Sequence, residues 1–181
     1  MNAEYVRLHT PPHIAPAHPD DAPAIARIHV AAWQAAYAGL LPADWLAALD
    51  VAERTQMWHA CITRGHPALR VAQVNGEIAG WICHAAAHDS ADPQHAELRA
   101  LYVAPSHWAR GIGRALWQHA RQELATAGYT CCHAWVLEGN TRAARFYYSQ
   151  GYTEHPPASR ALQIGEQQVN ELFFCTALKK N

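Results

Sequence analysis

Two glycines one residue apart, Gly111 and Gly113, occupy a turn that could bind a phosphate group. A strand-like segment precedes them, a helical pattern follows, and Arg110 and Arg114 stand on either side. Glycine has no Cβ, so an anion can approach the main-chain N–H groups closely, and the first turn of a helix leaves those groups unpaired. The partial positive charge of a helix N-terminus favours the same ligand. These residues predict a site for a phosphate-bearing cofactor.

The residues after the turn exclude two common phosphate loops. A dinucleotide fingerprint has a third glycine three residues after the second, and that position is Leu116. A Walker A loop continues with Lys and then Ser or Thr, and neither follows Gly113. A strand, a Gly-x-Gly turn and a helix remain, followed by a second strand and a helix that begins at Asn140. Gly-x-Gly alone is a weak signal, whereas the combination across residues 97–152 is much more specific.

The helices and strands that must position this turn are predicted from the spacing of their apolar residues, which differs between the two kinds of element. Helical spacing predicts helices over 24–37, 53–64, 112–127 and 140–150, with a shorter helix from Pro42. Alternating and β-branched segments predict strands over 13–17, 68–74, 78–83, 97–103, 130–136, 161–164 and 169–178. Asn75-Gly76 favours a hairpin turn, and residues 84–94 read as a polar loop. This order predicts an α+β or mixed α/β fold around one central sheet.

Composition narrows the class of protein. The chain has 181 residues, which predicts one domain, over 13–181. Residues 1–12 are polar and end in Pro11-Pro12, which predicts a loose arm. A net charge of −1 argues against a nucleic-acid partner. No apolar run approaches the roughly 20 residues of a membrane span, and no signal-peptide pattern opens the chain. Five cysteines without Cys-x-x-Cys spacing favour reduced thiols and a cytoplasmic location.

The middle of the chain resembles the GNAT superfamily of acetyl-CoA-dependent N-acetyltransferases. Three segments carry the resemblance: Glu97-Leu-Arg-Ala-Leu-Tyr-Val-Ala-Pro105, Arg110-Gly-Ile-Gly-Arg-Ala-Leu116 and Asn140-Thr-Arg-Ala-Ala-Arg-Phe-Tyr-Tyr-Ser-Gln-Gly-Tyr152. The resemblance implies the GNAT-like acyl-CoA N-acyltransferase fold, with helices on both faces of a mostly antiparallel, partly splayed sheet of six to seven strands. The order of elements agrees over the whole chain, and the specific motifs cover about its middle third.

The resemblance also implies a cofactor site. Main-chain N–H groups of the turn would bind the coenzyme A pyrophosphate, and the edge of the 97–103 strand would pair with the pantetheine amides. The residues expected at the cofactor are Leu101, Tyr102, Val103, Trp108, Ala109, Arg110, Gly111, Ile112, Gly113, Arg114, Asn140, Ala143 and Phe146. The chain departs from the family at Trp108, where Gln or Arg is usual. Any side-chain contact to phosphate from that position is lost, and Arg110 or Arg114 is expected to supply the charge.

Two residues are candidates for proton transfer. Tyr147 follows Asn140 by seven residues, so the two share a helix side about 10 Å apart. In the family the matching tyrosine protonates the departing coenzyme A sulfur, and the plain alternative is a tyrosine that packs on the sheet. Glu97 would share a strand face with Leu101 and Val103, and burial in an apolar cleft would raise its pKa. Several family members use this glutamate as general base, and a solvent-facing strand end is the alternative.

The acceptor side is less clearly marked. His84 belongs to the polar loop next to Glu97, which is expected to line the acceptor side and attract a cationic amine; a solvated loop is the alternative. Trp33 and Tyr37 are a second candidate, unless they only pack in the core. The histidines and aspartates at 84–95 suggest a metal site, but their spacing converges only on a helix, so we predict no metal.

The resulting prediction is direct transfer of an acetyl group from acetyl-CoA to the primary amine of a small molecule or peptide, without an acyl-enzyme. The alternatives are a non-catalytic acyl-CoA-binding regulatory domain, which would need neither Glu97 nor Tyr147, and an enzyme that uses a longer acyl chain. A homodimer is possible for the family, although no segment of the sequence marks an interface.

Overall fold

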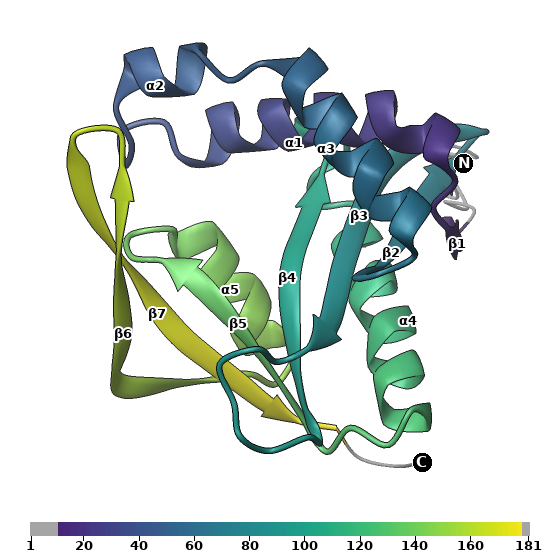
Figure 1. Cartoon of the computed structure of the whole chain (residues 1–181), viewed down its shortest axis with the longest axis vertical. Helices are drawn as coiled ribbons and strands as arrows, with labels where there is room; N and C mark the ends of the chain where they lie inside the picture. The colour runs from purple at the N-terminus through teal and green to yellow at the C-terminus, as the bar shows by residue number, and fades with distance from the viewer. Residues whose placement is uncertain (1–10, 179–181) are drawn as a thin grey trace, which may run out of the picture.

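Seven strands form one sheet in the computed structural model, which describes residues 11–178 apart from the side chains of residues 156 and 157. The sheet order is β1-β2-β3-β4-β5-β7-β6 (Figure 1). The strands are β1 (His13–Pro16), β2 (Ala68–Val74), β3 (Glu77–Ala86), β4 (His95–Val103), β5 (Cys131–Leu137), β6 (Thr153–Ile164) and β7 (Gln167–Ala177). Every neighbouring pair is antiparallel except β4 and β5, which confirms the predicted mixed fold and its strand number.

Helices cover both faces of the sheet. They are α1 (Ala22–Ala36), α2 (Ala43–Ala47), α3 (Val51–Arg64), α4 (Ile112–Thr126) and α5 (Thr141–Ser149), with short 3₁₀ helices η1 (Pro19–Asp21) and η2 (Pro105–His107). The helical spacing behind the predicted 112–127 helix is seen in α4 as a buried stripe, because Ile112, Leu116, Ala120 and Leu124 are all buried. Each side chain is one turn from the next, so the four lie along one face of the helix and pack together on the sheet.

The two larger hydrophobic cores among the described residues lie on the two faces of the sheet. On one face, α4 and α5 pack over the sheet around Leu116, Trp117 and Phe174. On the other face, α1 and α3 pack around Ile25 and Trp81. The sheet is thus the middle of three layers in its first half, which agrees with helices predicted on both faces.

Strands β4 and β5 remain paired over only three positions, from His95 opposite Cys131 to Glu97 opposite His133. Beyond Glu97 the two strands diverge toward the top of the view in Figure 1. Among residues 11–178, the divergence leaves no strand beside this edge of β4 from Leu98 to Val103. An unpaired edge presents free N–H and C=O groups, which makes it a place where another extended chain can bind.

A bulge in β4 changes which residues face which core. His84 lies opposite Leu98 while Cys83 lies opposite Ala100, so Arg99 is the extra residue. Leu98 and Leu101, three residues apart, both face the α4–α5 core as a result. Glu97 therefore points to the opposite face from Leu101 and Val103, and the prediction that the three share a face was wrong. Regular alternation fails where one extra residue enters a strand.

Some boundaries differ from the predictions. The hairpin at Asn75-Gly76 is present, with positive φ at both residues, as the type I′ turn requires. Strand β3 continues to Ala86, so the first three residues of the predicted 84–94 loop belong to the sheet. Strand β6 begins at Thr153, eight residues before the predicted start.

Two further expectations concern the ends of the chain and the membrane. The arm expected over 1–12 lies almost wholly outside the described residues, and the single domain over 13–181 stays a prediction. Within residues 11–178, no helix has the length and apolar character that crossing a membrane requires.

Candidate active site

A cleft of about 540 Å³ opens where β4 and β5 diverge. Its walls come from the end of α1, from β4, from the turn before α4, from β5 and from α5. The lining includes Tyr37, Leu101, Tyr102, Val103, Trp108, Ala109, Gly111, Ile112, Gly113, Arg114, Trp135, Asn140, Arg142, Ala143, Phe146 and Tyr147. All the predicted cofactor residues except Arg110 therefore lie around one cavity, although they come from three separate segments.

The turn before α4 presents main-chain groups at the mouth of this cleft. Gly111 has a φ of 80° and precedes the first residue of α4, with no side-chain cap on the helix. The N–H groups of the first helical turn are therefore free to bind a ligand. Gly113 serves packing as well, because a Cβ there would lie 3.4 Å from the Phe146 ring.

Trp108 holds a cation over this turn. Its Nε1 donates a hydrogen bond to the carbonyl oxygen of Val103 at 2.8 Å, which fixes the indole beside the β4 edge. The guanidinium of Arg142, from the first turn of α5, lies 3.8 Å from the centre of the indole ring. Arg114 also lines the cleft, whereas Arg110 is exposed outside it. Sequence reasoning missed Arg142, because nothing local relates it to a tryptophan 34 positions earlier.

Tyr147 is buried on α5 and also lines the cleft. Its ring packs edge-on against Tyr152 at 5.0 Å, and burial raises the pKa of its phenol above the ordinary value. At neutral pH the hydroxyl is therefore fully protonated and able to donate. Packing on the sheet and facing the cleft are both observed, so the two interpretations of this tyrosine are compatible.

Asn140 caps α5 and lines the same cleft. Its side-chain oxygen accepts a hydrogen bond from the N–H of Ala143 at 3.0 Å, as an N-cap residue does. The cap fixes the start of α5 and with it the direction in which Tyr147 is presented.

Glu97 is buried but does not line the cleft. Its Oε2 lies 2.9 Å from Nδ1 of His88 and 3.3 Å from Nε of Arg99. The carboxylate thus sits among polar partners, contrary to the apolar surroundings expected for it, because the bulge at Arg99 turns it away from Leu101. It occupies the last paired position at the base of the divergence.

The three acceptor candidates lie in different places. Tyr37 lines the cleft, and burial raises the pKa of its phenol. Trp33 packs edge-on against Tyr37 at 5.1 Å and is not part of the lining. His84 points away from the cleft, because its Nε2 lies 3.3 Å from Oε2 of Glu123 on α4. Its place inside β3, rather than in a loop, sends its side chain to the α4 face.

Comparisons with known proteins agree with this geometry. A model of the Acetyltransferase (GNAT) family matches residues 24–152. This chain belongs to the GNAT family. An uncharacterized N-acetyltransferase of Bacillus subtilis, YuaI, is 27% identical over 84% of this chain and 86% of its own length. The GNAT chain described here is thus an acetyl-CoA-dependent N-acetyltransferase, as its motifs predicted.

Solved structures share the fold of this GNAT protein. The PaiA N-acetyltransferase of Thermoplasma acidophilum, in complex with coenzyme A, has a TM-score of 0.75 at 18% identity and covers 93% of this chain and 99% of its own. YncA of Salmonella typhimurium, with acetyl-CoA, has a TM-score of 0.69 at 21% identity and covers 95% and 96%. At these identities the likeness concerns the fold.

The 87–94 loop lies against the far side of β5 in this GNAT chain. Oδ2 of Asp89 accepts a hydrogen bond from Nε1 of Trp135 at 3.1 Å, and Trp135 lines the cleft. Partial burial opposes ionisation of Asp89, but the bond from Trp135 and the nearby His133 outweigh it, so the pKa of the carboxyl lies below its ordinary value. The negative charge of Asp89 therefore lies behind Trp135, an aromatic side chain in the wall of the cleft. The sequence predicted only that Asp89 belongs to a loop.

Proposed function

We propose that this enzyme transfers the acetyl group of acetyl-CoA directly to a primary amine within the cleft between β4 and β5. The observation that carries the proposal is the convergence on one cavity of an unpaired β4 edge, an uncapped helix N-terminus and a buried protonated tyrosine. Cys131 and Cys132 lie outside the cleft lining, which supports direct attack over an acyl-cysteine intermediate.

The coenzyme would lie along β4. The pantetheine amides would pair with the free edge at Leu101 to Val103, in the manner of an added strand. The pyrophosphate would bind the N–H groups from Trp108 to Arg114, with Arg142 as the nearby cation. We expect Asn140, Ala143 and Phe146 to contact the pantetheine arm from α5, because they line the opposite wall.

The reaction moves protons at the amine nitrogen and at the leaving sulfur. The neutral amine nitrogen attacks the thioester carbonyl carbon, the C–S bond breaks and the thiolate takes a proton from the Tyr147 hydroxyl. The nitrogen loses one proton to water as the amide forms, and water returns one proton to the Tyr147 phenolate, so that acetyl-CoA plus neutral amine give amide plus free coenzyme A. Glu97 would accept a proton from the incoming ammonium through water, since its carboxylate stands at the base of the divergence rather than in the cleft.

The acceptor would enter beside Trp135 and Tyr37. An aromatic wall backed by the Asp89 carboxylate favours a cationic amine over a neutral or anionic substrate. Small amines, amino acids, aminoglycosides and peptide N-termini all satisfy this chemistry. A cytoplasmic location and a homodimer remain predictions from the sequence.

Replacing Tyr147 with Phe tests the proposal. We expect Tyr147→Phe to lower kcat by about 100-fold or more, the usual contribution of a general acid, while coenzyme A binding changes little. Thiol release from acetyl-CoA would be measured against a panel of primary amines, with calorimetry for coenzyme binding.

Tyr148→Phe is the matched control, because Tyr148 is exposed and its hydroxyl donates to Glu154 at 2.8 Å. Unchanged turnover in Tyr147→Phe at saturating amine, with intact coenzyme binding, would contradict the role of Tyr147. Coenzyme binding without turnover against any amine would favour a regulatory domain.

A further inference from the structure

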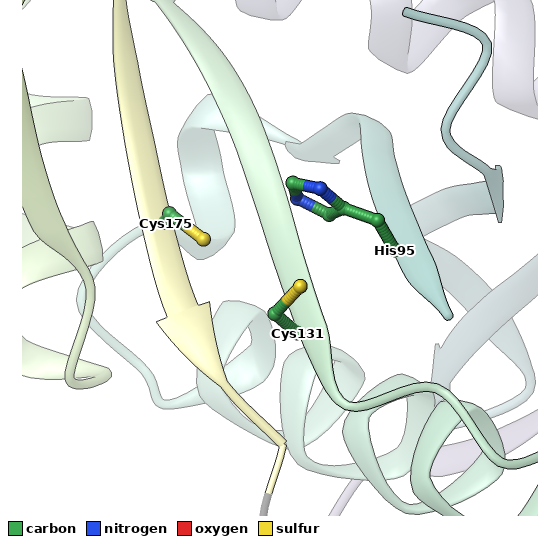
Figure 2. A group of neighbouring side chains, drawn as sticks. All are labelled: His95, Cys131 and Cys175. Carbon is green, nitrogen blue, oxygen red and sulfur yellow. The ribbon is translucent and has the colours of Figure 1, made fainter. Parts of the chain in front are cut away.

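Three soft and borderline metal ligands meet at the closed end of the divergence. His95 is the first residue of β4, Cys131 is the first residue of β5, and Cys175 lies on β7. His95 and Cys131 are register partners, while Cys175 lies opposite His133, two residues along β5. Figure 2 shows the imidazole and the two thiols turned into one space between the three strands.

The distances suit a single ion. One ligand atom from each residue lies within 4.8 Å of the other two. A tetrahedral Zn²⁺ with bonds of about 2.3 Å to sulfur and 2.0 Å to nitrogen holds its ligand atoms somewhat less than 4 Å apart. A contraction of about 1 Å or less, within the range of side-chain rotation, therefore assembles the site.

The three side chains are half-buried, so an ion can reach them while much of its surroundings stay dry. The other thiols differ, because Cys61, Cys83 and Cys132 are buried among apolar side chains. Among the described residues, only Cys131 on β5 and Cys175 on β7 are thiols that are both accessible and close to an imidazole.

Neighbouring groups hold the His95 ring in place. Its Nδ1 lies 3.2 Å from the Ser90 hydroxyl, and its Nε2 lies 3.2 Å from Nδ1 of His133. An ion that takes either nitrogen leaves the other one with a partner, which is the usual support for a metal-bound histidine. His133 continues the chain of polar contacts, since its Nε2 lies 3.5 Å from Oδ1 of Asp89.

We propose that His95, Cys131 and Cys175 bind one Zn²⁺ ion, with water as the fourth ligand. Both thiols lose their protons to solvent on binding, so the site holds two thiolates and one imidazole around the ion. The ion would join β4, β5 and β7 at the position where the sheet stays closed. It lies outside the cleft lining, so its role would be to fix the base of the divergence rather than to take part in acetyl transfer.

Metal titration of the full chain tests this site. The protein would be reduced, stripped with a chelator and titrated with Co²⁺ as a spectroscopic probe, then with Zn²⁺ in competition with a chromophoric chelator. We expect one equivalent to bind, a sulfur-to-cobalt charge-transfer band to appear, and the melting temperature to rise with Zn²⁺.

Matched variants separate a site from adventitious binding. Cys175→Ser should abolish the charge-transfer band and the thermal shift, and Cys61→Ser should keep both. His133→Ala should weaken Zn²⁺ binding by about 10-fold, as expected for a group that orients a ligand. The proposal is overturned if the reduced protein binds no Zn²⁺, if Cys175→Ser binds it as tightly as the parent chain, or if Cys131 and Cys175 form a disulfide that the stripped protein keeps under reducing conditions.

Discussion

The two halves of the sheet are covered differently. Strands β1 to β4 have α1 and α3 against one face and α4 against the other, and the side chains between them are mainly apolar or aromatic. Strands β5 and β7 have α5 against one face, whereas the 87–94 loop lies against part of the other. Under the loop, that second face carries imidazoles, thiols and half-buried aromatic rings, and an aliphatic cluster forms only at its far end, where Leu137 and Val169 pack against Leu41 and Leu46.

This difference explains where chemistry is possible. A strand packed between helices on both faces is held by the hydrophobic effect and tolerates little change, while a strand whose second face is covered partly by a loop can diverge from its neighbour without exposing a large core. The sheet opens between the two kinds of strand, at β4 and β5, and the cleft forms there. Four predictions test the contrast, including the tyrosine substitution described above.

The largest effect on stability is expected from two tryptophans in the two halves. Trp81 of β3 is fully buried, 4.6 Å from the Trp58 ring, so Trp81→Ala should lower the free energy of unfolding by about 3–5 kcal/mol. Trp135 of β5 is half-buried, so Trp135→Ala should cost about 1 kcal/mol. Urea denaturation measures both, and equal losses would remove the contrast between the halves.

A pH effect is expected from the first half. Burial, with a smaller contribution from Arg54, lowers the pKa of His29 to about 4, and Nδ1 of His29 accepts a hydrogen bond from Nε1 of Trp58. Between pH 6.5 and 4 the unfolded chain binds a proton at this residue that the folded chain does not. Stability should therefore fall as pH falls through this window, by roughly 1.4 kcal/mol per pH unit from this group.

His29→Gln keeps a hydrogen-bond acceptor but cannot take up this proton. The pH dependence of the free energy of unfolding should therefore lose the contribution of about one proton between pH 4 and 6.5. Denaturant midpoints at several pH values measure it, and an unchanged slope would show that His29 is protonated in the folded state.

The smallest effect is expected at the mouth of the cleft. Trp108→Ala should raise KM for acetyl-CoA by about 3- to 10-fold with little change in kcat, because Arg142 loses the ring that holds it. Trp108→Phe keeps an aromatic face and should lie closer to the parent enzyme. If Arg142 acts through Trp108, the double variant Trp108→Ala with Arg142→Ala should raise KM for acetyl-CoA no more than the more impaired of the two single variants does. Additive increases in the free-energy cost of binding would mean that the two residues act separately.

Local patterns predicted most elements because their causes are local. The four-residue spacing in α4, the Asn75-Gly76 turn and the Asn140 cap each depend on a few neighbouring residues, and each is present. The sheet face toward which Glu97 points was mispredicted, because the extra residue at Arg99 breaks the alternation of β4. No neighbouring residue in the sequence indicates this bulge. His84 was assigned to a loop because it is polar itself and a polar segment follows it from His88 to Gln94.

The sequence by itself determined that a strand, a glycine turn and a helix would follow one another at the predicted phosphate site, and that a second strand and helix carrying Asn140 and Tyr147 would come after them. Those features follow from backbone geometry and periodicity within short segments. Only the tertiary structure decided that β4 and β5 separate after three pairs, that Arg142 stacks on Trp108, and that His95, Cys131 and Cys175 meet. Each of these depends on the packing of segments far apart in the chain, and the free energy of that packing cannot be deduced from the residues of any single segment.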